Sequence, residues 1–390
     1  MSTTLKVKEQ ILKNPELKNE EIATKVNSTK NFVQKCRSQL RKDGKLPALD
    51  DNWRRKPSNH VGLSQECEAV GIPIDTVGNY WYKGKYYSIH AKNGGKTYFE
   101  LQDEIIGEMK KHSPKYPKLK YKKDSEGYLL VIDPADVHLN KLCSAFETGD
   151  EYNTEIAERR IMEGVQGILN KVQGFKIERI LFISGNDKLH VDTPRSTTTS
   201  GTPQDTHLMW YDAFRAAIRI ERKVIEMLLV VAPVHYQYNP SNHDYTNGFF
   251  MAQTIEAWFS KCKDVTFDVS IAHRKYFRYG LNLIASTHGD GAREQDLPLL
   301  MAHESGNYWS ECKNRYVYTH HIHHKKSKDY MSVCVESLRS PSGTDSWHHR
   351  NGYAHAPKAI EGFLHSKENG QIARITHLFS VLLISITHLF

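Results

Sequence analysis

The chain has 390 residues, of which 39% are hydrophobic and 25% charged, the balance of a globular protein with room for more than one domain. Its six cysteines are scattered without a C-x-x-C pair, and we expect no signal peptide, which argues against a cysteine-built zinc site and favours a reducing, cytoplasmic setting. The net charge of +8 lies in the first third, because residues 1–130 carry 25 Lys and Arg against 16 Asp and Glu, whereas residues 131–390 carry 28 against 29. We therefore expect a basic part that faces a polyanion, with a solvated lysine-rich surface as the alternative, ahead of a near-neutral catalytic part.

Residues 1–45 predict three short helices. Leu5, Val7, Ile11 and Leu12 form an apolar stripe on the first, and Ser28 or Thr29 caps the third. The pattern resembles a helix-turn-helix unit whose third helix enters a DNA groove, and the alternative is a small bundle that docks on protein. The side chains expected to contact DNA are those of Lys30, Gln34, Lys35, Arg37 and Arg41.

Two segments join this domain to the rest of the chain. Residues 46–60 contain two prolines and mixed charge and predict a linker. Residues 61–127 predict a small module, with a β-hairpin at 81–87 and an amphipathic helix at 99–112. The hairpin interleaves aromatic residues with lysines, which suits either base stacking or the core of a tiny sheet.

From residue 128 onwards, apolar runs that end at polar residues alternate with helical patterns. Such a rhythm predicts an α/β (α+β) domain over residues 128–375, with functional residues where strands end. The last residues, 376–390, form an apolar tail in which ITHLF, first present at 375–379, is repeated. The tail is too short for a spanning helix, so we predict no membrane association and expect an extra strand or an aberrant terminus. The expected strands are 128–133, 178–184, 234–238, 266–271, 281–286, 315–319 and 331–336, and the expected helices are 154–172 and 206–230.

Five short polar motifs follow apolar, strand-like runs in this domain. They combine carboxylate, imidazole and amide groups, the ligands that divalent cations of hard to borderline character take. Alternate residues of an extended chain point to the same side, so the ends of a D-x-H or H-x-H pair can bind one ion. Each motif alone is weak, but together they indicate a metal centre. They are Asp136-Val137-His138, Gly185-Asn186-Asp187 with His190 after it, Asn242-His243-Asp244, His288-Gly289-Asp290 and His321-Ile322-His323.

In this order the motifs resemble those of the metallophosphoesterase, or calcineurin-like phosphoesterase, superfamily: D-x-H, G-D, G-N-H-D/E, H and G-H-x-H. The resemblance covers about residues 128–375 and implies a two-sheet sandwich flanked by helices. It implies two divalent metal ions, for which manganese fits the ligand mixture best and iron, zinc or magnesium are alternatives. Carried over, the first metal is held by Asp136, His138 and His323, the second by Asn242, His288 and His321, and Asp187 bridges both, while His243 is the general acid, oriented by Asp244.

Three positions depart from the superfamily pattern. The second motif is G-N-D, and we align Asp187 with the bridging aspartate, since alignment of Asn186 would leave a neutral bridge. Ser241 and His320 stand where the superfamily has glycine. Because residues 320–324 hold four histidines, other ligand registers remain open in the fifth motif.

Further residues are candidates for substrate contact. The second motif with His190 resembles the G-G-D-x-x-H/D stretch of nuclease subunits of double-strand-break repair complexes, which implies that His190 touches substrate. The loop 192–206 offers hydroxyls and Arg195 to a phosphate backbone, with a plain polar loop as the alternative. Trp347 and Tyr353 follow the last motif and either stack on a base or close a core.

These features together predict a metal-dependent phosphodiesterase that acts on DNA, a nuclease. In the implied reaction, two cations lower the pKa of a bridging water, the hydroxide attacks phosphorus, and His243 protonates the leaving group. The arrangement also resembles phage-encoded calcineurin-like proteins, so DNA in a phage-infected bacterial cell is the expected partner. One alternative is a phosphomonoesterase or protein phosphatase on the same metal core, and another is a DNA-binding protein with a vestigial esterase domain. The oligomeric state stays open, with a homodimer as one option.

Overall fold

The computed structural model describes residues 3–15, 17–43, 45–46, 67–68, 79–83, 88–92, 103, 106–107, 109–121, 126–353 and 356–379. The expected linker at 46–60 and the tail end at 380–390 lie outside the described residues, apart from Leu46. The chain divides into two compact units, Met1–Asp103 and Glu104–Phe390. Among the described helices, none combines the length and the apolar character needed to cross a membrane.

The first unit begins with three helices packed around a small apolar core. Val7 and Ile11, four residues apart, are buried in it, whereas Leu5 and Leu12 of the expected stripe are exposed. The hydroxyl of Thr29 accepts a hydrogen bond from the backbone of Phe32 at 3.3 Å and so caps the third helix. The helices are α1 (Thr3–Lys13), α2 (Asn19–Lys25) and α3 (Lys30–Lys42), and a two-stranded antiparallel hairpin follows with β1 (Asn79–Lys83) and β2 (Ser88–Lys92).

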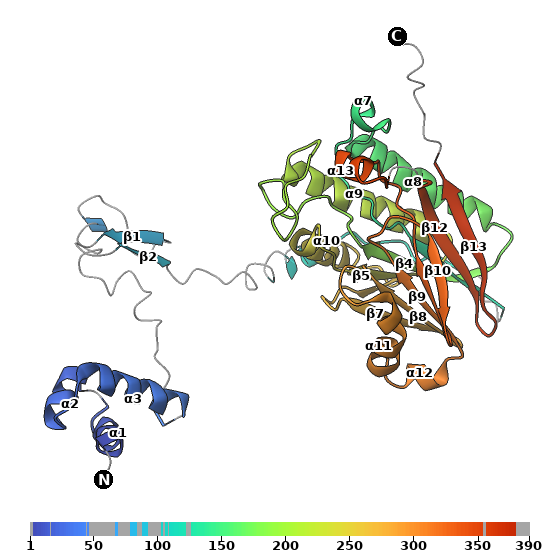
Figure 1. The fold of residues 1–390 in the computed structure, drawn as a ribbon. Helices are drawn as coiled ribbons and strands as arrows, with labels where there is room; N and C mark the ends of the chain where they lie inside the picture. The colour runs from blue at the N-terminus through green and yellow to red at the C-terminus, as the bar shows by residue number, and fades with distance from the viewer. Residues whose placement is uncertain are drawn as a thin grey trace. The chain divides into compact units, whose positions relative to one another are not determined.

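The second unit is built on two β-sheets (Figure 1). The first sheet has the order β13-β12-β3-β4-β5-β6, with β3 to β6 parallel, and the second has the order β10-β11-β9-β8-β7. The strands of the first sheet are β3 (Tyr128–Asp133), β4 (Ile177–Gly185), β5 (Val234–Asn239), β6 (Val265–Asp268), β12 (Ala359–Ser366) and β13 (Gly370–Leu378). Those of the second are β7 (Arg274–Tyr279), β8 (Asn282–Thr287), β9 (Asn314–Thr319), β10 (Lys326–Tyr330) and β11 (Val333–Ser337).

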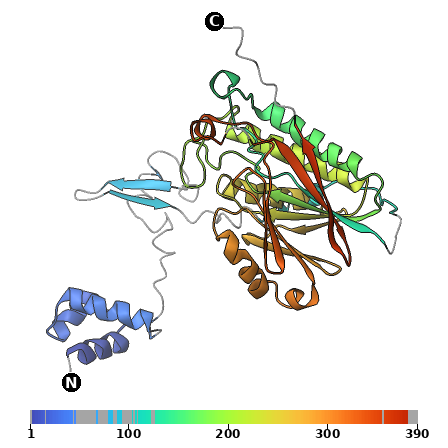
Figure 2. The same cartoon turned by 45° about the vertical axis from the view of Figure 1, so that its right-hand side comes forward.

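Alternating side chains place the two sheets face to face. On β3, Leu129 and Val131 enter the core between the sheets, whereas Leu130 and Ile132 point to the helices outside. Figures 1 and 2 show the resulting layers, with helices on both outer faces. This two-sheet sandwich flanked by helices confirms the predicted fold class. The first sheet is covered by α8 (Thr154–Lys171), α9 (Trp210–Leu229) and α10 (Tyr245–Trp258), and the second by α11 (Leu297–Glu304) and α12 (Tyr308–Glu311).

Residues 109–121 belong with the second unit, which differs from the expected boundary at residue 128. The Tyr116 ring stacks on Phe259 with a centroid distance of 5.0 Å, and its hydroxyl accepts a hydrogen bond from Trp258 at 2.9 Å. The Tyr121 hydroxyl donates to the Leu229 carbonyl at 2.8 Å. At the other end, β13 extends to Leu378, so the first ITHL segment is part of a sheet edge.

Candidate metal centre

The five motifs lie on loops that leave the carboxyl ends of β3, β4, β5, β8 and β9. Neighbouring loops are tied together, since the backbone N–H of Asp136 donates to the Asn186 carbonyl at 2.9 Å and that of His138 to the Asp187 carbonyl at 2.8 Å. Left-handed backbone angles are rare for residues other than glycine and accumulate at functional sites. They occur here at five expected ligands, Asp136 (φ 47°), His138 (φ 47°), Asp187 (φ 58°), His321 (φ 72°) and His323 (φ 58°).

Asp187 lies between the two expected sets of ligands. Its Oδ2 is 3.2 Å from His288 Nε2 and 3.8 Å from His138 Nε2, and its side chain is 1% exposed. Its Oδ1 accepts a hydrogen bond from the backbone of His243 at 3.0 Å, which holds the carboxylate in this orientation. One carboxylate oxygen therefore faces an imidazole from each set, the position that a bridging ligand takes.

The first ligand set consists of Asp136, His138 and His323, whose donor atoms lie within 4.8 Å of one another. His138 Nε2 is 3.1 Å from His323 Nε2, which in turn is 3.6 Å from Asp136 Oδ1. Tyr152 and Ser340 hold the first loop from behind, donating to the carbonyls of Val137 and Asp136, each at 2.6 Å.

The second set forms on the other side of Asp187. His288 and His321 form a group with Asp187 whose donor atoms lie within 4.8 Å of one another. Asn242 joins them, because its Oδ1 is 2.9 Å from His288 Nε2. All seven expected ligands thus surround one small volume, three on each side of Asp187.

The three departures from the superfamily pattern each have a structural place. The Asn186 side chain lies 3.5 Å from His320 Nε2, whereas Asp187 Oδ2 faces a histidine of each ligand set, so Asp187 is the residue between them. Ser241 Oγ accepts from the Asp187 backbone at 2.7 Å and donates to Asp244 at 2.6 Å, which links two motifs. His320 is buried between the Thr287 carbonyl and the Asp133 carboxylate, each 2.9 Å away, and takes no part in the ligand groups.

His243 faces the centre but is not oriented by Asp244, contrary to the expectation. Its Nδ1 donates to the carbonyl of His190 at 2.9 Å, which leaves Nε2 to the open side. The Asp244 carboxylate is fully buried and accepts instead from Ser241 and from the Leu189 backbone at 2.8 Å. The backbone of His190 therefore orients the candidate general acid, and Asp244 holds the loop that carries Asp187.

The His190 ring contacts the expected ligand His138 directly. Its Nδ1 lies 3.3 Å from His138 Nδ1, and its ring stacks on that of His243 at a centroid distance of 5.3 Å. If His138 binds a cation through Nε2, its Nδ1–H can donate to His190, an arrangement that fixes the ring of a metal ligand. His190 also lines the cleft described below, so it remains available for substrate contact.

Burial sets the protonation states of the centre. It holds the pKa of His138 and of His323 well below the usual histidine range, so that both imidazoles are neutral at neutral pH. Burial, aided by the charge of Asp187, raises the pKa of Asp136 to about 7. Against the effect of burial, the charge of Asp187 raises the pKa of His288 to about 9, and His288 in turn holds the pKa of Asp187 well below its usual range.

The residues present fit divalent cations. Neutral imidazoles, carboxylates and an amide oxygen are the donors that such ions use, and metal binding requires histidine in its neutral form, so His288 would release a proton as a cation binds. Asp136 and Asp187 are buried with four histidine ligands around them, and His288 Nδ1 has no hydrogen-bond partner among the described residues. A cation on each side of Asp187 would neutralise this buried carboxylate pair.

A cleft of about 630 Å³ opens onto the centre. His138, His190 and His243 line its floor, and Thr198, Ser200 and Thr202 of the loop 192–206 line one wall, whereas Arg195 of the same loop is exposed and is not among the lining residues. Sequence reasoning missed Lys141, which also lines the cleft although it is 1% exposed. The sequence signal that could have identified Lys141 was its closeness to the D-x-H motif.

Lys141 belongs to a short chain of charged groups at the cleft wall. Its Nζ is 2.7 Å from Asp345 Oδ2, and Asp345 Oδ1 is 2.7 Å from His348 Nδ1. Burial acts to raise the pKa of Asp345, but hydrogen bonding to His348 and the charge of Lys141 outweigh it and hold the pKa below its usual range. The His348 ring stacks on the ligand His323 at a centroid distance of 5.0 Å.

One residue expected to contact DNA has a different role. Arg37 of α3 is 9% exposed, and its guanidinium donates to Asn19 Oδ1 at 3.0 Å and to the carbonyls of Pro15 and Leu17 at 2.6 and 2.7 Å. It ties α3 to the turn before α2 and cannot reach a ligand without breaking these bonds. Lys30, Gln34 and Lys35 are exposed as expected, with Lys30 2.5 Å from Glu20, and the side chain of Arg41 lies outside the described part.

The sequence matches no protein-family model and no curated protein. Among solved structures, an archaeal phosphodiesterase matches at 10% identity and a TM-score of 0.31, over 65% of this chain and 99% of that chain. Vps29 of Entamoeba histolytica, complexed with zinc, matches at 12% and 0.26, over 64% and 99%. A Streptococcus pneumoniae TIGR4 protein described as a predicted phosphoesterase matches at 11% and 0.25, over 65% and 100%. Likeness at this level says nothing about activity, and the assignment of the centre rests on its own geometry.

Proposed function

We propose that this chain is a dinuclear-metal-dependent phosphodiesterase that acts on DNA. The observation that carries the proposal is the place of Asp187, whose Oδ2 lies 3.2 Å from His288 and 3.8 Å from His138 at the floor of a cleft. Two cations held there would provide a hydroxide near neutral pH and neutralise phosphate oxygens. The surrounding side chains would protonate the leaving oxygen and contact the phosphate.

His243 is the group proposed to protonate the leaving oxygen. A sugar alkoxide is a poor leaving group, and a positioned imidazolium can give it a proton. The contact of Nδ1 with the His190 carbonyl at 2.9 Å fixes the ring so that Nε2–H is the available donor. Lys141 and His190, both on the cleft, are suited to contact non-bridging phosphate oxygens.

The charge of the first third and the three N-terminal helices support DNA as the substrate. A basic surface supplies the salt-dependent part of nucleic-acid affinity. On α3, Lys30, Gln34 and Lys35 are exposed and would be available to a duplex, while Arg37 acts inside the unit. The complete set of seven candidate ligands speaks against a vestigial centre.

The test is cleavage of labelled single- and double-stranded DNA by the full chain with manganese, beside Asp187→Asn and Asp205→Asn. Asp187→Asn should lose cleavage and lower metal affinity by more than the roughly 10- to 100-fold that loss of an outer contact costs. Asp205 is an exposed cleft carboxylate outside the ligand groups, so its variant should keep both. Metal content is measured by mass spectrometry on each purified protein.

Other outcomes select other functions. Hydrolysis of phosphate monoesters or phosphopeptides with every DNA form left intact would identify a phosphomonoesterase or protein phosphatase on the same centre. Specific DNA binding without metal uptake or hydrolysis would leave the N-terminal helices as the functional part.

A further inference from the structure

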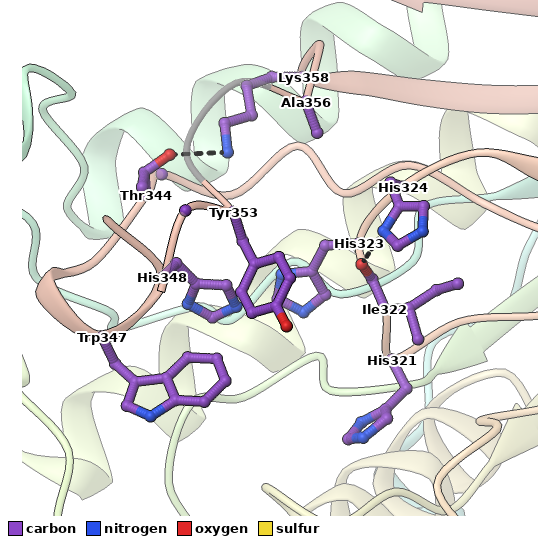
Figure 3. Close-up of a pocket in the computed structure, with 12 residues that line it drawn as sticks. His321, Ile322, His323, His324, Thr344, Trp347, His348, Tyr353, Ala356 and Lys358 are labelled. Atoms are coloured by element: carbon purple, nitrogen blue, oxygen red, sulfur yellow. Dashed lines mark hydrogen bonds between the residues drawn. The ribbon is translucent and has the colours of Figure 1, made fainter. Parts of the chain in front are cut away.

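A second pocket, of about 480 Å³, adjoins the metal centre (Figure 3). It shares His321, His323, Trp347 and His348 with the cleft, so these side chains border both openings. Its volume lies in the range of about 300–1,000 Å³ in which proteins bind small organic groups. None of the roles proposed so far uses this space.

Two aromatic rings form one wall of the pocket. Trp347 and Tyr353 stack on each other with a centroid distance of 5.9 Å and an interplanar angle of 27°. They are 61% and 58% exposed, so they do not close a core, the alternative that the sequence left open. Trp347 lies on the short helix α13 (Ser346–Arg350), next to His348, whose ring it meets edge-on at 5.1 Å. An exposed aromatic pair beside His348, which itself stacks on the expected ligand His323, is a surface on which a flat ring can lie.

The inner end of the pocket is polar. Lys358 is 8% exposed, and its ammonium donates to the hydroxyl of Thr344 at 3.1 Å, as the dashed line in Figure 3 marks. The backbone N–H of Thr344 donates to Asp150 at 2.9 Å, which fixes this corner. The ammonium carries three donors, so it can also serve an oxygen or ring nitrogen of a bound group.

We propose that this pocket binds the base of an unpaired nucleotide adjacent to the scissile phosphate, an inference that rests on the proposed function. The pocket shares a wall with the ligands His321 and His323, and one sugar separates a base from its phosphate, so a phosphate at the centre places its base within reach. Every base has a π-face, so stacking on Trp347 tolerates any sequence.

The proposal also implies that the substrate is unpaired at the position of cleavage. A base can enter the pocket only after leaving the duplex stack, which costs least in single strands and at frayed or damaged ends. Cleavage therefore takes place at unpaired nucleotides, and the duplex, when present, is held elsewhere.

Two phosphodiesters with the same leaving group test the pocket. Thymidine 5′-(p-nitrophenyl phosphate) and methyl p-nitrophenyl phosphate both release p-nitrophenolate, and only the first carries a base. Stacking of the base predicts a KM for the thymidine ester roughly 5- to 150-fold lower with the manganese-loaded full chain. Trp347→Ala should abolish this preference, measured as the ratio of the two KM values, whereas Trp347→Phe should retain most of it.

A matched control is Tyr211→Ala. Tyr211 is an exposed aromatic residue, 47% exposed and 5.8 Å from Trp210, outside the pocket. It should keep the preference. Equal loss for both esters in Trp347→Ala would assign Trp347 a structural role, and no preference in the wild type would mean that no base binds there; either result overturns the proposal.

A binding measurement distinguishes failure of the base-site proposal from failure of the proposed function. If neither ester is hydrolysed, equilibrium dialysis of thymidine 5′-monophosphate and inorganic phosphate against the metal-loaded full chain decides about the pocket alone. Roughly tenfold tighter binding of the nucleotide, lost in Trp347→Ala, supports the base site without any catalysis. Equal affinities for the two ligands reject it.

Discussion

His243 could join a ligand group with His138 and His190, but its contacts also suit the proposed role of a proton donor. Its Nδ1 is occupied by the His190 carbonyl, and its ring is fixed between His190 and His138, whose centroids lie at 5.3 and 4.6 Å. A metal ligand could use only Nε2, which faces the cleft where substrate must lie. The hydrogen bond to the His190 carbonyl therefore favours a role for His243 in proton transfer, whereas its neighbour Asn242 lies among the expected metal ligands.

If His243 is a proton donor, the loss of rate in His243→Ala should depend on the leaving group. His243→Ala should slow DNA cleavage by about 10²- to 10⁴-fold, the typical contribution of a general acid, because an alkoxide leaves badly without a proton. Thymidine p-nitrophenyl phosphate should lose little, since p-nitrophenolate needs no proton to depart. The measurement compares kcat/KM for both substrates in wild type and variant.

The exposed histidine His349 on α13 provides the control: His349 contributes no atom to any ligand group, so His349→Ala should leave both rates unchanged. A loss of equal size for both substrates in His243→Ala, together with lost metal, would mean that His243 supports the centre rather than the leaving group.

At the residue scale, the sequence motifs identified the side chains that lie close together in the structure. They did not identify all the contacts of those side chains. The register of the fifth motif depends on His320, which turns inward to Asp133, and no local pattern reveals a partner 187 positions away. The prediction that Asp244 orients His243 was wrong, because the Asp244 carboxylate accepts instead from Ser241 and from the distant Leu189 backbone. Arg37 was assigned to DNA because a buried arginine looks like an exposed one in sequence.

Among the elements, β12 contains a buried histidine that should make the fold sensitive to acid. Burial lowers the pKa of His365 from 6.5 to about 3. Its Nε2 lies 2.9 Å from the Tyr318 hydroxyl on β9, and its Nδ1 has no hydrogen-bond partner among the described residues. A proton on Nδ1 would therefore be buried and unpaired in the folded state.

The sign of the effect follows from the lowered pKa. The unfolded chain binds the proton more readily, so the contribution of His365 to stability is complete above pH 6.5 and is lost as the pH falls toward 3. Between pH 7 and pH 5 this amounts to about 2 kcal/mol. Denaturant unfolding at both pH values should give that difference between the wild type and His365→Phe, which keeps a ring against Tyr316. An unchanged pH slope in the variant would show that other groups dominate acid sensitivity.

The strands that the sequence predicted best are the apolar ones. The parallel strands β3, β4 and β5 are buried on both faces and stood out as apolar runs. β10 has the sequence KSKDY at an exposed sheet edge, so it lacks the apolar residues by which a strand is recognised. β12 and β13 were missed although β12 is buried, because their sequences mix polar and apolar residues, with Glu361 held by arginines from elsewhere.

At the scale of the whole molecule, the boundary between the units decides which fragments fold. Residues 109–121 contribute side chains to the face of the second unit formed by α9 and α10. Besides Tyr116 and Tyr121, Ser113 takes part, since its carbonyl accepts from Lys261 at 3.0 Å. The segment is polar and rich in lysine, so its composition resembles that of the basic first third, which is why the sequence analysis placed it before the boundary at residue 128.

Two truncations test this boundary. A chain of residues 104–390 should match the full chain in the melting of its catalytic unit and in turnover of methyl p-nitrophenyl phosphate. A chain of residues 128–390 loses the stacking of Tyr116 on Phe259 and the hydrogen bonds to Trp258 and Leu229. At about 1 kcal/mol for each contact, the loss is roughly 3 kcal/mol. For a unit of this size that corresponds to a Tm lower by about 6–12 °C, measured by circular dichroism.

The point variant Tyr116→Ala in the full chain separates a local effect from one of chain length. It removes one ring and two hydrogen-bonding contacts, including the donation of the Tyr116 hydroxyl to Glu226 at 2.8 Å, so it should account for the larger part of the drop in Tm. Equal melting of both truncated chains would mean that the segment only rests on the surface and that the unit ends at residue 128. A stable, active 104–390 chain with weakened DNA affinity would instead assign catalysis to the second unit and DNA capture to the basic first unit.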